Sequence, residues 1–260
     1  MHYGDLSLFV LVVLFGVFFV AGFIDSIAGG GGLLSIPALL LAGIPPQYAL
    51  GTNKFIVVFG TASALVNFIK HKKIIYKITL LSVVFSLLGA HIGTELILSL
   101  SESIATKVIL FLLPLSALSI FIPHNFVKNN PKSFNSIQTF LYAPLLSLLI
   151  GVYDGFFGAG TGTFLILGFY LFLQMDMLSA SASAKAINLA SGLGSLVTFA
   201  FSNHIFYFLA LPLIVANILG GYTGSKLAIK KGVGLIRIFI IISFVLVFIS
   251  LLLKYLKSYS

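Results

Sequence analysis

Long apolar runs separated by short polar connections dominate the chain. Eight runs have about the 20 residues that a membrane-spanning helix needs, at residues 6–28, 47–69, 75–99, 104–122, 137–157, 178–201, 205–228 and 234–256. Two shorter runs lie at 33–43 and 162–175. We therefore predict an all-α, polytopic membrane protein. In it the short runs form half-helices, re-entrant segments or strongly tilted crossings.

Composition agrees with this class. The chain is 59% hydrophobic and 8% charged, whereas an ordinary soluble domain is about 25% charged. The net charge of +9 lies mainly in short loops between apolar runs, so it indicates membrane topology rather than nucleic-acid binding. The first 24 residues have no basic residue before their apolar run and no small-residue cleavage site, which favours a retained span over a cleaved signal peptide. We predict a multi-pass protein of the cytoplasmic (inner) membrane, in contact with lipid.

Glycine-rich segments interrupt two of the runs. Asp25 precedes Gly29–Gly32, and Asp154 precedes Gly158–Gly162. Each glycine costs a helix roughly 1 kcal/mol relative to alanine, and lipid cannot satisfy the freed backbone groups. Such breaks survive at membrane depth where they line a cavity, so we expect the functional site there.

The two halves of the chain resemble each other. Residues 63–68 match 194–199, and residues 88–96 match 219–227. Lys54 and Lys185 share the same offset of 131 positions, and Asp25 and Asp154 are 129 positions apart. Chance similarity of apolar helices is the alternative, but small residues at matched spacing favour a duplication. We predict a first repeat at 1–127, a cytoplasmic linker at 128–136 and a second repeat at 137–260.

Loop charges indicate that the repeats are inverted. Lysines 70, 72, 73 and 77 surround one connection of the first half, while the matching connection around Asn203 has none. In the next pair of matching connections the charges are reversed, with Glu102 in the first half and Lys226, Lys230 and Lys231 in the second. Matching loops on opposite sides are typical of inverted repeats. An inverted repeat needs an odd number of crossings, so we predict five membrane segments per half and both termini outside. Lys254 and Lys257 then lie outside as well, against the rule that lysines and arginines concentrate in cytoplasmic loops.

The two lysines are the leading candidates for substrate binding. Lys54 lies roughly 10 Å into a helix that begins near Gln47, at 1.5 Å per residue, and Lys185 occupies the matching place. Lysines near span ends can snorkel to the surface. A buried ammonium is costly, however, and two matched copies facing one cavity would attract an anion.

Neutral groups near the breaks would complete an anion site. Asn53 and Asn188 can donate amide hydrogen bonds, Thr52, Ser183 and Thr161 carry hydroxyls, and glycine-rich turns at helix starts expose N–H groups. Each hydroxyl can instead bond to its own helix. The predicted substrate-binding residues are Lys54, Lys185, Asn53, Asn188, Thr52, Ser183, Gly30, Gly31, Gly32, Gly160, Thr161 and Gly162.

The two aspartates have competing interpretations. Asp25 and Asp154 could cap the helices that follow the breaks, or carry a coupling proton or cation. An anion site next to two ionised carboxylates would be self-defeating unless they point away or are protonated. His91 and Glu95 share a helix face, but Tyr222 and Lys226 replace them in the second half, so we interpret them as interfacial.

Catalytic motifs are not evident. Tyr153-Asp154 and the segment 37–39 resemble parts of intramembrane aspartyl proteases, but the Gly-x-Gly-Asp and C-terminal Pro-Ala-Leu of that class are missing. The chain also lacks His-Glu-x-x-His, Gly-x-Ser-x-Gly and a nucleotide-binding phosphate loop. With no cysteine, it offers no cysteine-ligated metal site. We predict a protein that is not an enzyme and that needs no metal or cofactor.

The segment 24–39, followed by 43–46 and 49–54, resembles the TauE/SafE-type sulfite exporter family. Residues 158–162 and 184–188 resemble its second-half signature, so the likeness spans nearly the whole chain. Ser183 and Ala184 replace Thr52 and Asn53 in the second half, which departs from strict equivalence. The resemblance implies a transporter for sulfite, sulfoacetate or related sulfur-containing anions, usually an exporter.

These inferences combine into one functional prediction. We expect a secondary transporter that moves a small sulfur-containing anion by alternating access, as a monomer or homodimer, with H⁺ or Na⁺ as a coupling ion. An anion channel, or a permease for a different small anion, is the alternative.

Overall fold

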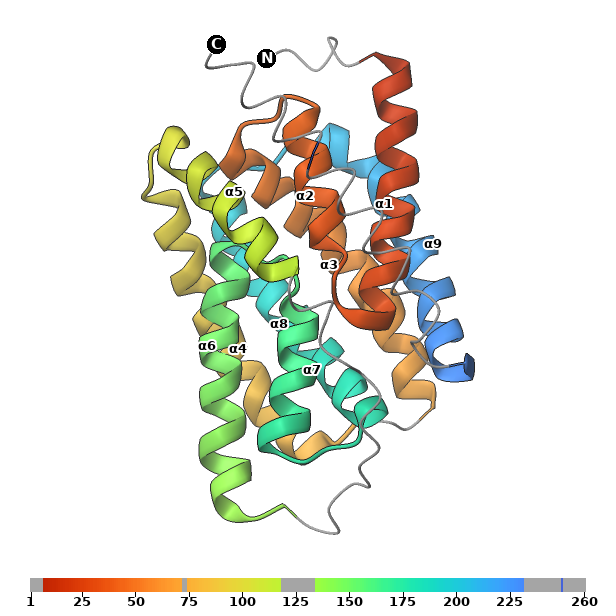
Figure 1. The fold of residues 1–260 in the computed structure, drawn as a ribbon, viewed down its shortest axis with the longest axis vertical. Helices are drawn as coiled ribbons and strands as arrows, with labels where there is room; N and C mark the ends of the chain where they lie inside the picture. Colours follow the sequence, from red (N-terminus) through yellow and green to blue (C-terminus); the bar gives the residue numbers. More distant parts are fainter. Residues whose placement is uncertain (1–6, 72–73, 118–133, 232–248, 250–260) are drawn as a thin grey trace.

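The computed structural model describes residues 7–71, 74–117, 134–231 and 249, and all regular structure in these ranges is helical. The helices are α1 (Leu8–Ala28), α2 (Gly32–Leu41), α3 (Pro46–Lys70), α4 (Tyr76–Leu98), α5 (Glu102–Ala117), the π-helical turn η3 (Gln138–Tyr142), α6 (Ala143–Phe156), α7 (Thr161–Phe172), α8 (Met177–Phe201) and α9 (Tyr207–Lys231). Figure 1 shows them as one elongated bundle.

Six of the eight predicted long runs are confirmed as helices long and apolar enough to cross a membrane. They are α1, α3, α4, α8, α9 and the continuous pair of η3 and α6. The run 104–122 forms α5 as far as Ala117, and its remainder lies outside the described residues. The last run, 234–256, also lies outside them apart from residue 249.

The outer surface of the bundle is apolar. Leu80 and Val84 of α4 and Phe208, Leu211 and Val215 of α9 are all more than half exposed. Such a large apolar surface marks contact with lipid or another protein. Charged side chains are instead buried inside, among them Lys185, which is 1% exposed. This inside-out distribution identifies a multi-pass membrane protein.

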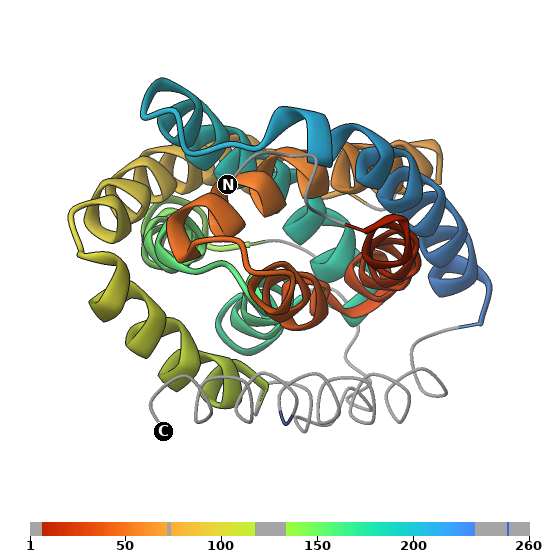
Figure 2. The ribbon, with the colours of Figure 1, turned by 90° about the horizontal axis from the view of Figure 1, so that it is seen from above.

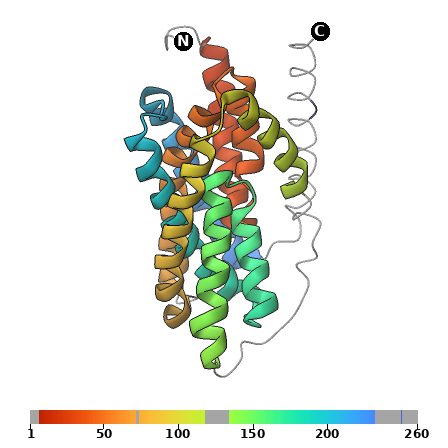
Figure 3. The ribbon, with the colours of Figure 1, turned by 90° about the vertical axis from the view of Figure 1, so that its left-hand side faces the viewer.

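Two short helices double back inside the bundle. In Figures 1 and 3, α1 starts at the upper end and α2 returns to it, while α6 starts at the lower end and α7 returns there. The helices α2 and α7 have 10 and 12 residues, or about 15–18 Å at 1.5 Å per residue, roughly half of a 30 Å hydrocarbon core. The two helix pairs therefore enter from opposite ends and meet inside the bundle.

Backbone conformation explains where these helices stop. Gly29 ends α1 with φ 80°, and its N–H donates to the Asp25 carbonyl at 2.8 Å. After α6, Gly158 and Gly160 have φ 85° and 84°. L-residues with side chains rarely adopt this left-handed conformation. Glycine at these positions thus allows each chain reversal.

Small residues bring α4 against α6 and α1 against α9, pairs that lie side by side in Figure 2. A Cβ at Gly93 of α4 would collide with the Val152 carbonyl of α6, and one at Gly224 of α9 with the Phe23 carbonyl of α1. Gly89 and Gly220 face the Leu148 and Phe19 carbonyls in the same way. Because 93 and 224 differ by 131, and 23 and 152 by 129, matched positions make matched contacts.

Candidate functional site

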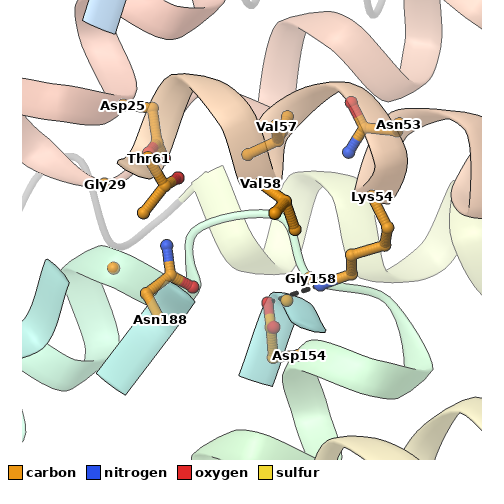
Figure 4. Close-up of a pocket in the computed structure, with 13 residues that line it drawn as sticks. Asp25, Gly29, Asn53, Lys54, Val57, Val58, Thr61, Asp154, Gly158 and Asn188 are labelled. Carbon is orange, nitrogen blue, oxygen red and sulfur yellow. Dashed lines mark ion pairs between the residues drawn. The ribbon is translucent and has the colours of Figure 1, made fainter. Parts of the chain in front are cut away.

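A cavity of about 30 Å³ lies where the two helix breaks meet (Figure 4). Since roughly 10–15 Å³ admits one water molecule, it has room for a small ion. Its walls come from α1, α3, α6, α8 and the starts of α2 and α7. The lining residues are Asp25, Gly29, Gly32, Asn53, Lys54, Val57, Val58, Thr61, Asp154, Gly158, Gly162, Asn188 and Gly192.

Lys54 faces this cavity and is paired with Asp154. The lysine Nζ lies 2.7 Å from Asp154 Oδ1, and the two residues are 7% and 2% exposed. Gly158 makes room for the ammonium, since a Cβ there would lie 2.7 Å from Nζ. Lys54 is therefore held inside the bundle and does not snorkel to its surface.

Lys185 forms the matching pair with Asp25. Its Nζ lies 3.0 Å from Asp25 Oδ2 and also donates to the Asp25 carbonyl oxygen. That carbonyl also accepts from the Gly29 N–H. Lys185 is not one of the residues that line the cavity. The two pairs thus have the same chemistry but differ in exposure to the cavity.

Both ion pairs join opposite halves of the chain. Asp25 and Asp154 lie in the last turns of α1 and α6, where helix carbonyls concentrate negative partial charge. Each lysine compensates a carboxylate and a helix C-terminus together. The starts of α2 and α7, at Gly32 and Gly162, contribute the positive ends of two helices to the same cavity. With two lysines and two aspartates, the formal charge of the four side chains sums to zero.

The two breaks touch directly. The backbones of Gly29 and Gly162 are so close that a Cβ on Gly162 would lie 2.6 Å from the Gly29 Cα. Of the predicted glycines, Gly32 and Gly162 line the cavity, whereas Gly30, Gly31 and Gly160 do not. The Thr161 hydroxyl donates to the Gly158 carbonyl at 3.0 Å and also lies outside the lining.

The predicted polar partners divide into two groups. Asn53 and Asn188 line the cavity, and in Figure 4 their amides project from opposite walls. The hydroxyls of Thr52 and Ser183 instead accept hydrogen bonds from the N–H groups of Phe206 and Ile75, at 3.0 and 3.3 Å. Neither hydroxyl residue lines the cavity.

Both aspartates pair with lysines in this structure. The N-cap residues of α2 and α7 are Gly31 and Gly160, and neither makes a side-chain cap hydrogen bond. A buried lysine is a stronger partner for a carboxylate than a backbone N–H is. His91 and Glu95 are exposed on α4, and His91 Nδ1 lies 2.8 Å from the Thr198 hydroxyl, away from the cavity.

Thr61 and Gly192 are lining residues that the sequence analysis did not identify. Each lies seven positions, two helical turns, after Lys54 or Lys185, so helical periodicity would have placed them on the lysine faces. Gly29, Val57, Val58 and Gly158 also line the cavity and were not among the predicted binding residues. Asn53 Oδ1, Thr61 Oγ1 and Asp154 Oδ2 are buried without a hydrogen-bond partner, which indicates unused bonding capacity at the cavity wall.

The chain is similar to known membrane proteins over most of its length. The family described as Sulfite exporter TauE/SafE matches residues 14–251. The chain belongs to the TauE/SafE sulfite exporter family. Each of the following relatives is 36% identical to it. A "Probable membrane transporter protein" of Haemophilus influenzae covers 92% of both chains, and "Probable membrane transporter protein ORF9" of Sinorhizobium sp. covers 95% of this chain and 94% of its own. The match to "Probable membrane transporter protein YfcA" of Escherichia coli K12 covers 89% of this chain and 86% of the relative.

No solved structure matches this TauE/SafE family member. Membership establishes a multi-pass membrane protein of a transporter family.

Proposed function

We propose that the protein is a secondary transporter that exports a small sulfur-containing anion, such as sulfite, sulfoacetate or a related organosulfonate, by alternating access. The substrate binds in the cavity between the two helix breaks. Lys54 provides the main positive charge there, while Asn53 and Asn188 orient the anion. The starts of α2 and α7, at Gly32 and Gly162, add N–H groups and favourable helix dipoles.

The grouping of polar and charged residues around one cavity supports this proposal. A buried lysine, two asparagines and two helix starts converge, together with the carboxylates of Asp25 and Asp154, on one small cavity inside the helical bundle. Buried ionisable groups are costly in a membrane and mark ion or substrate pathways. Membership in a sulfite exporter family adds the sulfur oxyanion as substrate class. A cavity of about 30 Å³ suits an inorganic oxyanion directly, and a longer organosulfonate requires it to widen.

The repeat architecture supplies the moving parts. We infer two inverted repeats, 1–127 and 137–260, joined by a linker at 128–136 whose Lys128 and Lys132 lie outside the described residues. The matched glycine contacts and the two reciprocal ion pairs support this symmetry. Because each pair spans both halves, rocking one half against the other changes access to the lysines. The helix pairs α1/α2 and α6/α7 each return to the end from which they start, so the proposed odd number of crossings in each half depends on the segments that follow each pair.

Cysteine labelling tests the inverted arrangement. The ends of α3 and α9 lie in the lower half of the bundle in Figure 1, and the connection after α8 lies at the upper end. Single cysteines at His71, Asn203 and Lys230 can be introduced into a chain that has none of its own. A membrane-impermeant reagent added outside should modify only the Asn203 position. Modification of all three from one side would refute the arrangement.

Transport by the purified protein in proteoliposomes tests the function. We expect sulfite flux that saturates and shows counterflow, with sulfoacetate and other sulfur anions as competitors. Imposed H⁺ and Na⁺ gradients identify the coupling ion. Unsaturable, voltage-driven current would establish the channel alternative instead, and the absence of any sulfur-anion flux from folded protein would reject the proposed substrate.

A further inference from the structure

The cavity contains a hydrogen-bond acceptor that an oxyanion without a proton cannot satisfy. Asp154 is 2% exposed, and only its Oδ1 is paired with Lys54. Its Oδ2 is buried without a hydrogen-bond partner, and Asp154 is one of the residues that line the cavity. Figure 4 shows the carboxylate directed toward the Lys54 ammonium. A buried, unsatisfied carboxylate oxygen costs more than a neutral one. The missing partner must be a donor.

The oxyanion that binds Lys54 would meet this oxygen. An oxyanion without a proton brings only acceptors, so its oxygens would repel the Asp154 carboxylate. A protonated oxyanion brings one O–H, which can donate to Oδ2 while its other oxygens accept from Lys54 and the asparagines. Charge supports the same choice, because the two lysines and two aspartates already cancel.

We infer that the site takes its oxyanion together with one proton, so that hydrogensulfite rather than sulfite dianion is the bound form. The inference rests on the proposed function. The proton lies between the anion oxygen and Asp154 Oδ2, and the complex has the same composition whichever oxygen holds it. Each transported hydrogensulfite therefore carries one proton, and an oxyanion that brings no proton binds more weakly.

The other charged groups around Asp154 do not replace this proton. Lys54 on α3 occupies Oδ1, and Asp25 on α1 is held by Lys185 of α8. On its own helix, the Tyr153 hydroxyl donates to the Ala159 carbonyl at 2.5 Å. On α4, which packs against α6, His91 and Glu95 are exposed. Within the described residues, the cavity offers Oδ2 no charged donor of its own.

Equilibrium binding to the full-length protein tests the inference. The probes are sulfite, phosphate, sulfate and methanesulfonate, at pH values on both sides of the hydrogensulfite ionisation, which lies near neutrality. Sulfate and methanesulfonate have no proton to donate in this range, and phosphate retains at least one. The apparent affinity for total sulfite should fall about tenfold for each pH unit above that ionisation, as one-proton linkage requires. Sulfate and methanesulfonate should bind at least about tenfold more weakly than hydrogensulfite, the ratio expected for one lost hydrogen bond to a charged group.

Asp154→Asn provides the matched variant, because its amide can donate to an unprotonated oxyanion. It should reduce the discrimination against sulfate and flatten the pH dependence. Tyr153→Phe, next to it in sequence, should retain both. If Asp154→Asn does not fold, the wild-type panel still decides the question.

Sulfite binding that tightens as pH rises, or sulfate that competes equally with sulfite, would overturn the inference and leave the proposed function standing. Phosphate bound in preference to sulfate, with no sulfite binding, would support proton selectivity but reject the sulfur substrate. Failure of all four anions to bind folded protein would reject both.

Discussion

Replacing Lys185 with methionine should lower the free energy of unfolding by about 3–5 kcal/mol, the cost of leaving one partner of a buried ion pair uncompensated. Lys185 is 1% exposed and donates to both the carboxylate and the carbonyl oxygen of Asp25. The variant leaves the carboxylate facing the C-terminal end of α1 without its cation. Reversible denaturation of the purified protein in mixed micelles measures the loss.

Two control variants isolate the contribution of the Lys185–Asp25 ion pair to stability. Lys185→Met combined with Asp25→Asn should recover most of the lost stability, because the uncompensated charge is removed as well. Lys226→Met removes an exposed lysine whose ammonium lies 4.3 Å from the Tyr222 ring centroid, and its effect should stay below about 1 kcal/mol, as is usual for exposed charges. Equal losses for Lys185→Met and Lys226→Met would show that the buried pair has no special role.

Replacing Lys54 with glutamine should weaken sulfite binding about tenfold or more, corresponding to roughly 1.5–3 kcal/mol for a hydrogen bond to a charged group. Glutamine keeps much of the side-chain length but removes the positive charge from the cavity. Lys185→Gln should affect affinity less, since Lys185 does not line the cavity. Equilibrium binding to both purified variants makes the comparison.

The double variant Lys54→Gln with Asp154→Asn separates the effect of the lysine charge on sulfite binding from its effect on folding. It leaves no uncompensated carboxylate, so it should fold, yet it should still bind sulfite weakly. Wild-type affinity in this folded double variant would show that Lys54 serves only to neutralise Asp154.

The apolar pattern predicted the helices well because length and hydropathy are local properties. The short runs gave α2 and α7, whose lengths indicated half-helices. Their return toward the starting end was one of several alternatives, since it depends on left-handed glycines such as Gly29 and Gly160. Sequence therefore predicted where each chain reversal occurs but not its direction.

Long-range partners explain what the sequence did not reveal at the site. Lys185 is paired with a residue 160 positions away, and Thr52 accepts from the N–H of Phe206, 154 positions away. The matched offsets identified the two lysines and two aspartates, but their pairing across the two halves arises only when the helices pack together in the folded bundle. A rule that buried charges need partners would have suggested such pairs without specifying them.

A crystal structure with bound selenite, a heavier analogue of sulfite, tests most directly whether the cavity binds the substrate. We expect one selenium anomalous peak in the cavity between the helix breaks, with a selenite oxygen about 3 Å from the Lys54 Nζ. Asn53 and Asn188 should flank it. A peak elsewhere in the bundle, or an empty cavity at selenite concentrations that saturate transport, would contradict it.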